Sequence, residues 1–135
     1  MKASDPNAVF AFEVSVAGTD WTCLVNERTP GRAKKTYWYQ VVDAWPDVPF
    51  TAMRCRKLGP PQNTREFKRT AEYRGLPHVN CGDRVQVGQA GGVIVGKNSS
   101  ANFDVLFDVD APEYRGLRLN VHPAEILFET PRSTR

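Results

Sequence analysis

The sequence FAFEVSV at residues 10–16 places an apolar side chain on every second position, with Glu13 and Ser15 among the residues between them. A period of two is that of a strand with one buried face. The next four residues, AGTD, are typical of a turn, and residues 21–25 then alternate again. The two runs predict an antiparallel hairpin.

A helix is predicted after this hairpin. Thr29 supplies an N-cap oxygen and Pro30 a fixed φ at the first helical position. Apolar residues then recur at every fourth position as far as Trp45, where two prolines prevent the helix from continuing. Residues 50–57 read as a further strand, so residues 1–58 are predicted to form a β-β-α-β domain.

The segment GPPQ at residues 59–62 is the strongest break in the pattern and marks the predicted boundary. A short helix is expected at residues 64–73, with Asn63 and Glu66 as a capping box and a glycine shortly after it as the stop. Because this piece is rich in Lys and Arg, residues 59–78 are interpreted as a basic connector.

Short alternating segments separated by Gly or Asn follow in residues 79–128 and predict a small closed β structure. The expected strands are residues 83–87, 92–95, 103–107, 117–121 and 125–128. Residues 129–135 are expected to be a flexible tail. The predicted fold class of the whole chain is therefore α+β.

Four of these segments carry a resemblance to a known fold: GDRVQV at 82–87, GGVIVG at 91–96, FDVLF at 103–107 and LNVHPAEI at 119–126. They resemble an SH3-like barrel with a KOW-type opening, in which a Gly-Asp pair starts the first strand. The resemblance implies five strands, with a single-turn helix at residues 122–125 before the last one. The connection at residues 88–90 lacks the Lys or Arg usual in KOW motifs, so the resemblance implies the fold and not the nucleic-acid-binding role.

Positive charge is concentrated in the middle of the chain. The formal net charge is +3, but residues 27–74 contain eleven Lys or Arg against five Asp or Glu. Such a field favours an anionic partner, commonly nucleic acid, and nearby aromatic faces can stack on bases. The predicted nucleic-acid-binding residues are Arg28, Arg32, Lys34, Lys35, Trp38, Arg54, Arg56, Lys57, Arg65, Lys68 and Arg69; Arg74 is the eleventh basic residue of the segment.

The sequence also contains parts of one catalytic pattern and one metal-binding pattern. Asp47 and the pair Glu66 and Lys68 have the letters of a PD-ExK nuclease, but that chemistry needs the motif on adjacent strands, and a turn and a helix are predicted there. His78 and Cys81 have the spacing of zinc ligands, and Cys23, Cys55 or His122 would have to complete the site. Neither pattern is complete, so we expect no enzyme activity, metal or cofactor.

No apolar run approaches the length of a membrane-spanning helix, and the first residues do not resemble a secretion signal. The odd number of cysteines, three, favours reduced thiols. We therefore expect a cytoplasmic protein without a membrane partner.

The leading hypothesis is a small non-enzymatic protein that contacts DNA or RNA through the basic surface of its N-terminal half. The alternative is a phage-type inhibitor or adaptor that binds a host protein, with the SH3-like barrel as its interaction module. The alternative draws on a general resemblance of the chain to small accessory proteins of temperate bacteriophages, carried by WPDVPF at 45–50 and by residues 98–108.

Overall fold

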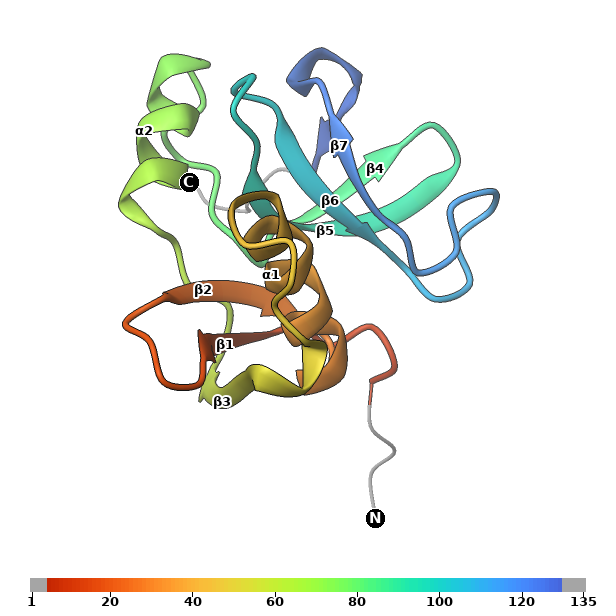
Figure 1. The fold of residues 1–135 in the computed structure, drawn as a ribbon. Coiled ribbons are helices and arrows are strands. Elements are labelled where there is room, and N and C mark those ends of the chain that lie inside the picture. The colour runs from red at the N-terminus through yellow and green to blue at the C-terminus, as the bar shows by residue number, and fades with distance from the viewer. Residues whose placement is uncertain (1–4, 130–135) are drawn as a thin grey trace. The chain divides into compact units, whose positions relative to one another are not determined.

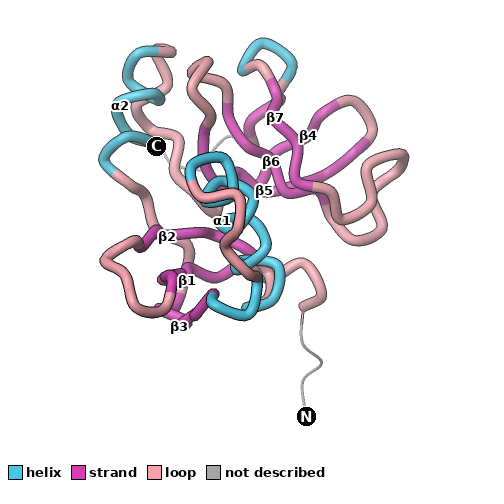
Figure 2. Tube along the Cα trace, viewed as in Figure 1, coloured by secondary structure: helices cyan, strands magenta, loops and turns pink. Residues whose placement is uncertain are grey.

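The structure is a computed structural model that describes residues 5–129. The chain divides between Gln62 and Asn63 into two compact units. Within the described residues there are two α-helices and two antiparallel sheets, which confirms the predicted α+β class (Figures 1 and 2). Each unit has a hydrophobic core of its own, and each is described by itself.

The N-terminal unit is a three-stranded antiparallel sheet, in the order β2-β1-β3, with one α-helix on it (Figure 1). Its elements are β1 (Phe10–Val16), β2 (Thr22–Glu27), α1 (Pro30–Ala44), the 3-10 helix η1 (Phe50–Ala52) and β3 (Met53–Gly59). The order of elements is the predicted one. The difference is at residues 50–52, which form a 3-10 turn where the sequence predicted the start of the last strand.

The alternation in β1 produces this core directly. Phe12 and Val14 point to the same side of the sheet and are buried with Ala33 and Val41 of α1. The helix begins as predicted, because the Thr29 hydroxyl accepts a hydrogen bond from the backbone N–H of Arg32 at 3.2 Å. The predicted hairpin and helix are thereby confirmed.

The C-terminal unit contains α2 and a five-stranded antiparallel sheet in the order β7-β6-β5-β4-β8. Its elements are α2 (Arg65–Tyr73), β4 (Arg84–Val87), β5 (Ala90–Lys97), β6 (Phe103–Phe107), β7 (Arg118–Val121), the 3-10 helix η2 (Pro123–Glu125) and β8 (Leu127–Phe128). The single-turn helix expected before the last strand is present, and His122 Nδ1 caps it by accepting the N–H of Ala124 at 3.0 Å.

The strand pairing shows that the prediction of a closed barrel for residues 79–128 is wrong. In the described part of the chain β7 and β8 lie at opposite edges of the sheet and do not pair, and β8 has only two residues. A helix takes part in the core instead. Phe67 and Ala71 of α2 are buried with the apolar side chains of the sheet, and the ring centroids of Phe67 and Phe103 are 5.5 Å apart. Because α2 covers this apolar surface, the sheet need not close on itself to bury it.

The helix predicted as a separate basic connector belongs to the C-terminal unit. Its N-cap is Thr64, whose hydroxyl accepts the N–H of Phe67 at 3.0 Å, and not the predicted Asn63. The helix stops as predicted at Gly75, which adopts φ +74°, a conformation that favours glycine. Apart from Glu129, the predicted tail lies outside the described residues.

The boundary between the units is marked by two side-chain amides. The Asn26 amide binds the backbone of Gln62, donating to its carbonyl at 2.8 Å and accepting from its N–H at 3.0 Å. The Asn63 amide accepts the N–H of Cys81 at 2.7 Å and donates to Asn80 Oδ1 at 2.9 Å. Each of the two adjacent residues is therefore tied to its own unit.

Candidate functional site

The predicted basic residues are divided between the two units. The N-terminal unit contains Arg28, Arg32, Lys34, Lys35, Arg54, Arg56 and Lys57, together with Trp38. The C-terminal unit contains Arg65, Lys68, Arg69 and Arg74. What each cation contacts within its own unit decides which of them remain available to a ligand.

Arg32 is committed to a buried carboxylate. Its Nε donates to Glu27 Oε1 at 3.0 Å, and the backbone N–H of Arg28 donates to the same oxygen at 2.9 Å. Glu27 is only 1% exposed, and a buried charge needs this compensation. The contact also joins the end of β2 to the start of α1. Arg32 therefore has a structural role.

The cations of β3 are exposed, and each has an intramolecular contact. Arg56 pairs with Glu13 at 2.9 Å, Arg54 donates to a backbone carbonyl at 2.8 Å, and Lys57 Nζ lies 3.6 Å from the centroid of the Phe10 ring. The Arg56 and Glu13 side chains are 70% and 46% exposed, and such a pair contributes little to stability. These cations can leave their internal contacts and bind an external anion at a small cost in stability.

Trp38 anchors the chain that follows α1. Its indole Nε1 donates to the carbonyl of Val48 at 3.1 Å, and its ring lies against Tyr39 and Phe50, with centroids 5.4 and 5.8 Å away. Lys34 Nζ lies 5.7 Å from the Phe50 centroid. Trp38 itself is half-buried, so its outer neighbours Tyr39 and Phe50, 58% and 38% exposed, are the aromatic faces that solvent reaches.

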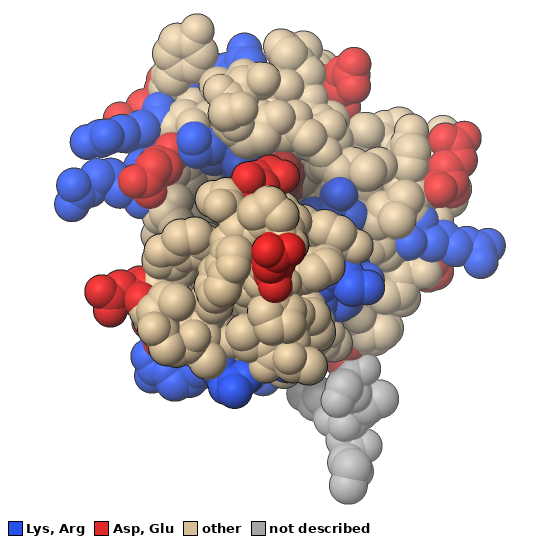
Figure 3. All heavy atoms as spheres, viewed as in Figure 1, with Lys and Arg blue, Asp and Glu red and all other residues tan. Residues whose placement is uncertain are grey.

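On the face that Figure 3 shows, positive charge is not continuous over the N-terminal unit. On the face that Figure 3 shows, Lys and Arg gather below β3 and beside α1, and surface that is mostly uncharged separates them. Acidic side chains lie on this intervening surface. The arrangement on this face is that of separate basic groups.

In the C-terminal unit, Lys68 braces the loop after α2. Its Nζ donates to the carbonyls of Pro77 and Val79, each at 2.9 Å, and to Asn80 Oδ1 at 3.1 Å. All three ammonium hydrogens therefore have acceptors within the unit. The structure places this predicted contact residue in a supporting role.

Arg74 connects the end of α2 to the turn between β5 and β6. Its Nε donates to the carbonyl of Ala101 at 2.8 Å, and its Nη2 donates to Asn102 Oδ1 at 3.0 Å. Ala101 has φ +62°, which a residue other than glycine rarely adopts. The guanidinium thus holds the turn close to the helix, and an open groove forms between the two.

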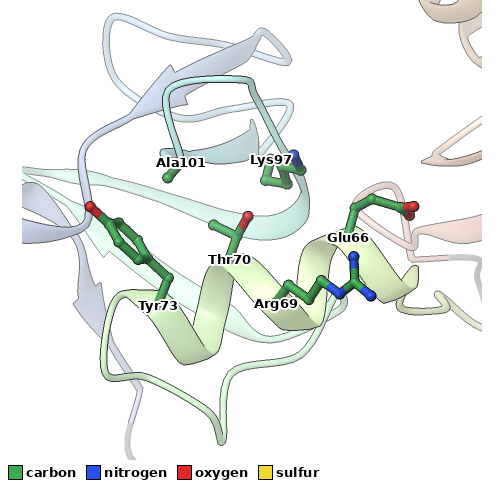
Figure 4. A pocket seen from close by; sticks show the side chains of 6 residues that line it. All are labelled: Glu66, Arg69, Thr70, Tyr73, Lys97 and Ala101. Atoms are coloured by element: carbon green, nitrogen blue, oxygen red, sulfur yellow. The ribbon is translucent and has the colours of Figure 1, made fainter.

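The side chains around this groove are shown in Figure 4. Its volume is about 300 Å³. It is lined by Glu66, Arg69, Thr70 and Tyr73 of α2, by Lys97 at the end of β5 and by Ala101 of the turn. Arg69 and Thr70 follow Glu66 by three and four positions, and Tyr73 follows them by four and three, so the four helical residues lie on one face of α2. The volume of the groove is at the lower end of the range for small-ligand pockets.

The groove has a charged end and an aromatic end. In Figure 4 the side chains of Arg69 and Glu66 extend to one end, while Tyr73 lies at the other, beside Ala101. Among residues 5–129 neither Arg69 nor Lys97 forms an ion pair. Tyr73 is 78% exposed. Two cations available to an anion therefore stand near an open aromatic ring.

Of the residues that line this groove, Arg69 is the one predicted from the sequence as a nucleic-acid contact. Arg65 is exposed at the start of α2 and does not line it. Tyr73 was missed, although it lies four positions after Arg69 on the predicted helix. Lys97 was also missed, because only the tertiary fold brings the end of β5 to α2.

Within the described residues, the side chains of the PD-ExK pattern and of the zinc-ligand pattern are not assembled into a site. Asp47 lies in the connection after α1, whereas Glu66 and Lys68 are on α2 in the other unit, so none of the three is on a strand. Among the described residues no three His, Cys, Asp or Glu side chains are grouped to hold a metal ion. Burial raises the pKa of the Cys81 thiol to about 12, which disfavours the thiolate that metals bind.

No family model matches the chain, and no match is found among curated proteins or solved structures. In the part of the chain that the structure describes, neither helix has the length and apolar character needed to cross a bilayer.

Proposed function

We propose that this is a small, non-enzymatic nucleic-acid-binding protein of the cytoplasm, and that the groove between α2 and the β5–β6 turn is its primary contact. The observation that carries the proposal is the pair Arg69 and Lys97, two cations that form no ion pair with any residue the structure describes, beside the exposed Tyr73 ring. Cations that neutralise phosphates and aromatic faces that stack on bases are the two components of sequence-tolerant binding.

The basic residues of the N-terminal unit are secondary in this proposal. Lys34, Lys35, Arg54 and Arg56 add to the positive field that attracts a polyanion, but they are dispersed over α1 and β3. Arg32 and Lys68, in contrast, are needed by the fold.

The test is binding of a labelled oligonucleotide of mixed sequence, followed by fluorescence anisotropy over a range of salt concentrations. We expect affinity to fall steeply with salt, and Arg69→Glu to weaken binding and to reduce the slope of log K against log salt by about 0.7 or more. Arg115→Glu is the matched control, because Arg115 is also exposed and lies in the loop at the opposite end of β6.

Two results would overturn the proposal. One is the absence of salt-sensitive binding to any oligonucleotide by the whole chain. The other is an equal loss of affinity in Arg69→Glu and Arg115→Glu, which would mean that net charge alone is responsible. A loss confined to an Arg54→Glu, Arg56→Glu double variant would move the contact to β3 of the N-terminal unit.

A protein-binding role is the second candidate, favoured by a different observation. Four aromatic residues of the N-terminal unit are 37–58% exposed, namely Trp21, Tyr39, Trp45 and Phe50. Exposed aromatic residues are enriched at protein interfaces. A phage-type inhibitor or adaptor that binds a host protein would retain a stoichiometric protein partner in a pull-down from nuclease-treated bacterial lysate, and a nucleic-acid-binding protein would not.

For the C-terminal unit we propose an open variant of the SH3-like fold. Five antiparallel strands and the 3-10 helix η2 before β8 support this likeness, and α2 supplies the part of the core that barrel closure would provide. SH3-like modules serve either of the two functions, so the fold does not choose between them.

A further inference from the structure

We infer that the groove of the C-terminal unit binds one nucleotide of a single strand, with the base stacked on Tyr73 and the adjoining phosphate held by Arg69 and Lys97. This inference rests on the proposed function and specifies its ligand: single-stranded nucleic acid or an unpaired loop, in preference to a duplex. It is carried by the arrangement of the aromatic and charged ends of the groove.

Tyr73 is a positioned platform rather than a loose side chain. It is the last residue of α2, and the Arg74 guanidinium carbon lies 5.7 Å from the centroid of its ring. Arg74 is itself fixed by acceptors in the β5–β6 turn, including the carbonyls of Ala101 and Ser100. With 78% of Tyr73 exposed, a large part of the ring is open to a base.

A base can lie on this ring only if its own face is uncovered. In a duplex each base is covered by its neighbours, and unstacking costs free energy that a single strand does not require. A groove of about 300 Å³ also suits one nucleotide and is too small to receive a double helix. Both considerations favour an unpaired strand.

The spacing along α2 suits one nucleotide. Tyr73 and Arg69 are four residues apart, which places their Cα atoms about 6 Å apart along the helix axis. Lys97 reaches the same groove from β5, so the two cations approach a phosphate from two different elements. Thr70 lies between the two ends, and Ala101 lies beside Tyr73; both side chains are small and leave room for a sugar (Figure 4).

Glu66 limits how much negative charge the groove accepts. Its carboxylate extends toward the same end as Arg69, so it repels a second phosphate placed there (Figure 4). Glu66→Gln should therefore tighten binding of every polyanion, including heparin, which has no bases. The preference for single strands over duplex should stay unchanged in this variant, because the stacking partner is unaltered.

The experiment compares three probes at one salt concentration: a labelled single-stranded oligonucleotide, the same strand annealed to its complement, and labelled heparin. Whole-chain protein carrying Tyr73→Ala, Tyr73→Phe or Tyr39→Ala is measured against the natural sequence. Tyr39 is the matched control, an exposed tyrosine on the N-terminal unit. A circular dichroism spectrum and a thermal unfolding transition like those of the natural sequence establish that each variant is folded.

We expect the single strand to bind more tightly than the duplex, and Tyr73→Ala to weaken only single-strand binding, by about tenfold as for the loss of one base stack. Tyr73→Phe should restore it, and Tyr39→Ala should leave it unchanged. Equal affinity for single strand and duplex, with no effect of Tyr73→Ala but a clear effect of Arg69→Glu, would overturn this inference and leave the proposed function standing. Absence of salt-sensitive binding to both nucleic acids would remove the proposed function itself.

Discussion

The Arg84 guanidinium and the Asp108 carboxylate form two parallel hydrogen bonds, 2.8 Å from Nη1 to Oδ1 and 2.7 Å from Nη2 to Oδ2. The pair joins β4 to the end of β6 across the intervening strand β5. The Asp108 side chain is 12% exposed and that of Arg84 is 42% exposed, so water competes only partly for these bonds. A bidentate pair of this kind contributes to stability and also fixes the relative orientation of the two side chains.

Asp108→Ala is expected to lower the free energy of unfolding by about 2 kcal/mol, because it removes two charge-assisted hydrogen bonds. Arg84→Ala should cost a similar amount, and the double variant little more than either, since both remove the same interaction. Urea unfolding of the three variants measures this. Fully additive losses would show that the pair does not act as a unit.

Gly91 and Gly92 are adjacent in β5 but should respond differently to a methyl group. A Cβ at Gly92 would lie 2.8 Å from Val105 Cγ1 and 3.0 Å from the carbonyl oxygen of Leu106, and that backbone cannot move without disturbing β6. A Cβ at Gly91 would meet the ends of the Asp108 and Arg84 side chains at 2.9 and 3.0 Å.

We therefore expect Gly92→Ala to destabilise by about 3 kcal/mol and Gly91→Ala by about 1 kcal/mol. Thermal unfolding of the two variants, measured side by side, checks the order. A greater loss in Gly91→Ala would mean that the Arg84 and Asp108 side chains are less able to move than the strand backbone.

Stability should depend on the Cys81 thiol at alkaline pH. Burial raises its pKa from 9.0 to about 12 in the folded chain. Below pH 9 the thiol is protonated in both states, but between pH 9 and about 12 only the unfolded chain loses the proton. The free energy of unfolding should then fall by up to about 1.4 kcal/mol per pH unit from this group.

The comparison is urea unfolding of the natural sequence and of Cys81→Ala across this pH range. The variant should lose stability less steeply with pH, although it starts from a lower value because a buried side chain is shortened. Parallel curves would show that the thiol ionises equally in both states.

Lys68→Ala should separate stability from binding. It removes the three donors that hold Pro77, Val79 and Asn80, so the C-terminal unit should lose about 1–2 kcal/mol. At a temperature where the variant is folded, its affinity for single strands should stay within about twofold of the natural sequence. A loss as large as that of Arg69→Glu would return Lys68 to the contact surface.

The sequence predicted those elements whose signals are local. The alternation of β1, the Thr29 cap and the stop at Gly75 each depend on residues within a few positions, and the structure has all three. The open sheet was not predictable from such signals. It depends on the packing of Phe67 and Ala71 on strands that lie far along the chain. The spacing of these two residues would be the same if the short helix were only a connector.

The candidate site shows the same division. Counting charges located the basic region, but a cation's availability depends on acceptors that are distant in sequence: Arg56 meets Glu13 across 43 positions, and Lys68 meets Pro77 across nine. A count of charges cannot distinguish the cations with the most complete internal contacts from Arg69. For the same reason Lys97 carried no signal until β5 and α2 were placed together.

The two amides at Gln62 and Asn63 make a practical dissection available. A protease site or a flexible tether inserted at that single bond would leave the two Asn26 contacts with one half and the Cys81 contact with the other. Ligand affinity measured before and after such an insertion would reveal how much of the binding is achieved by the second half alone, and how much requires the first to be held nearby.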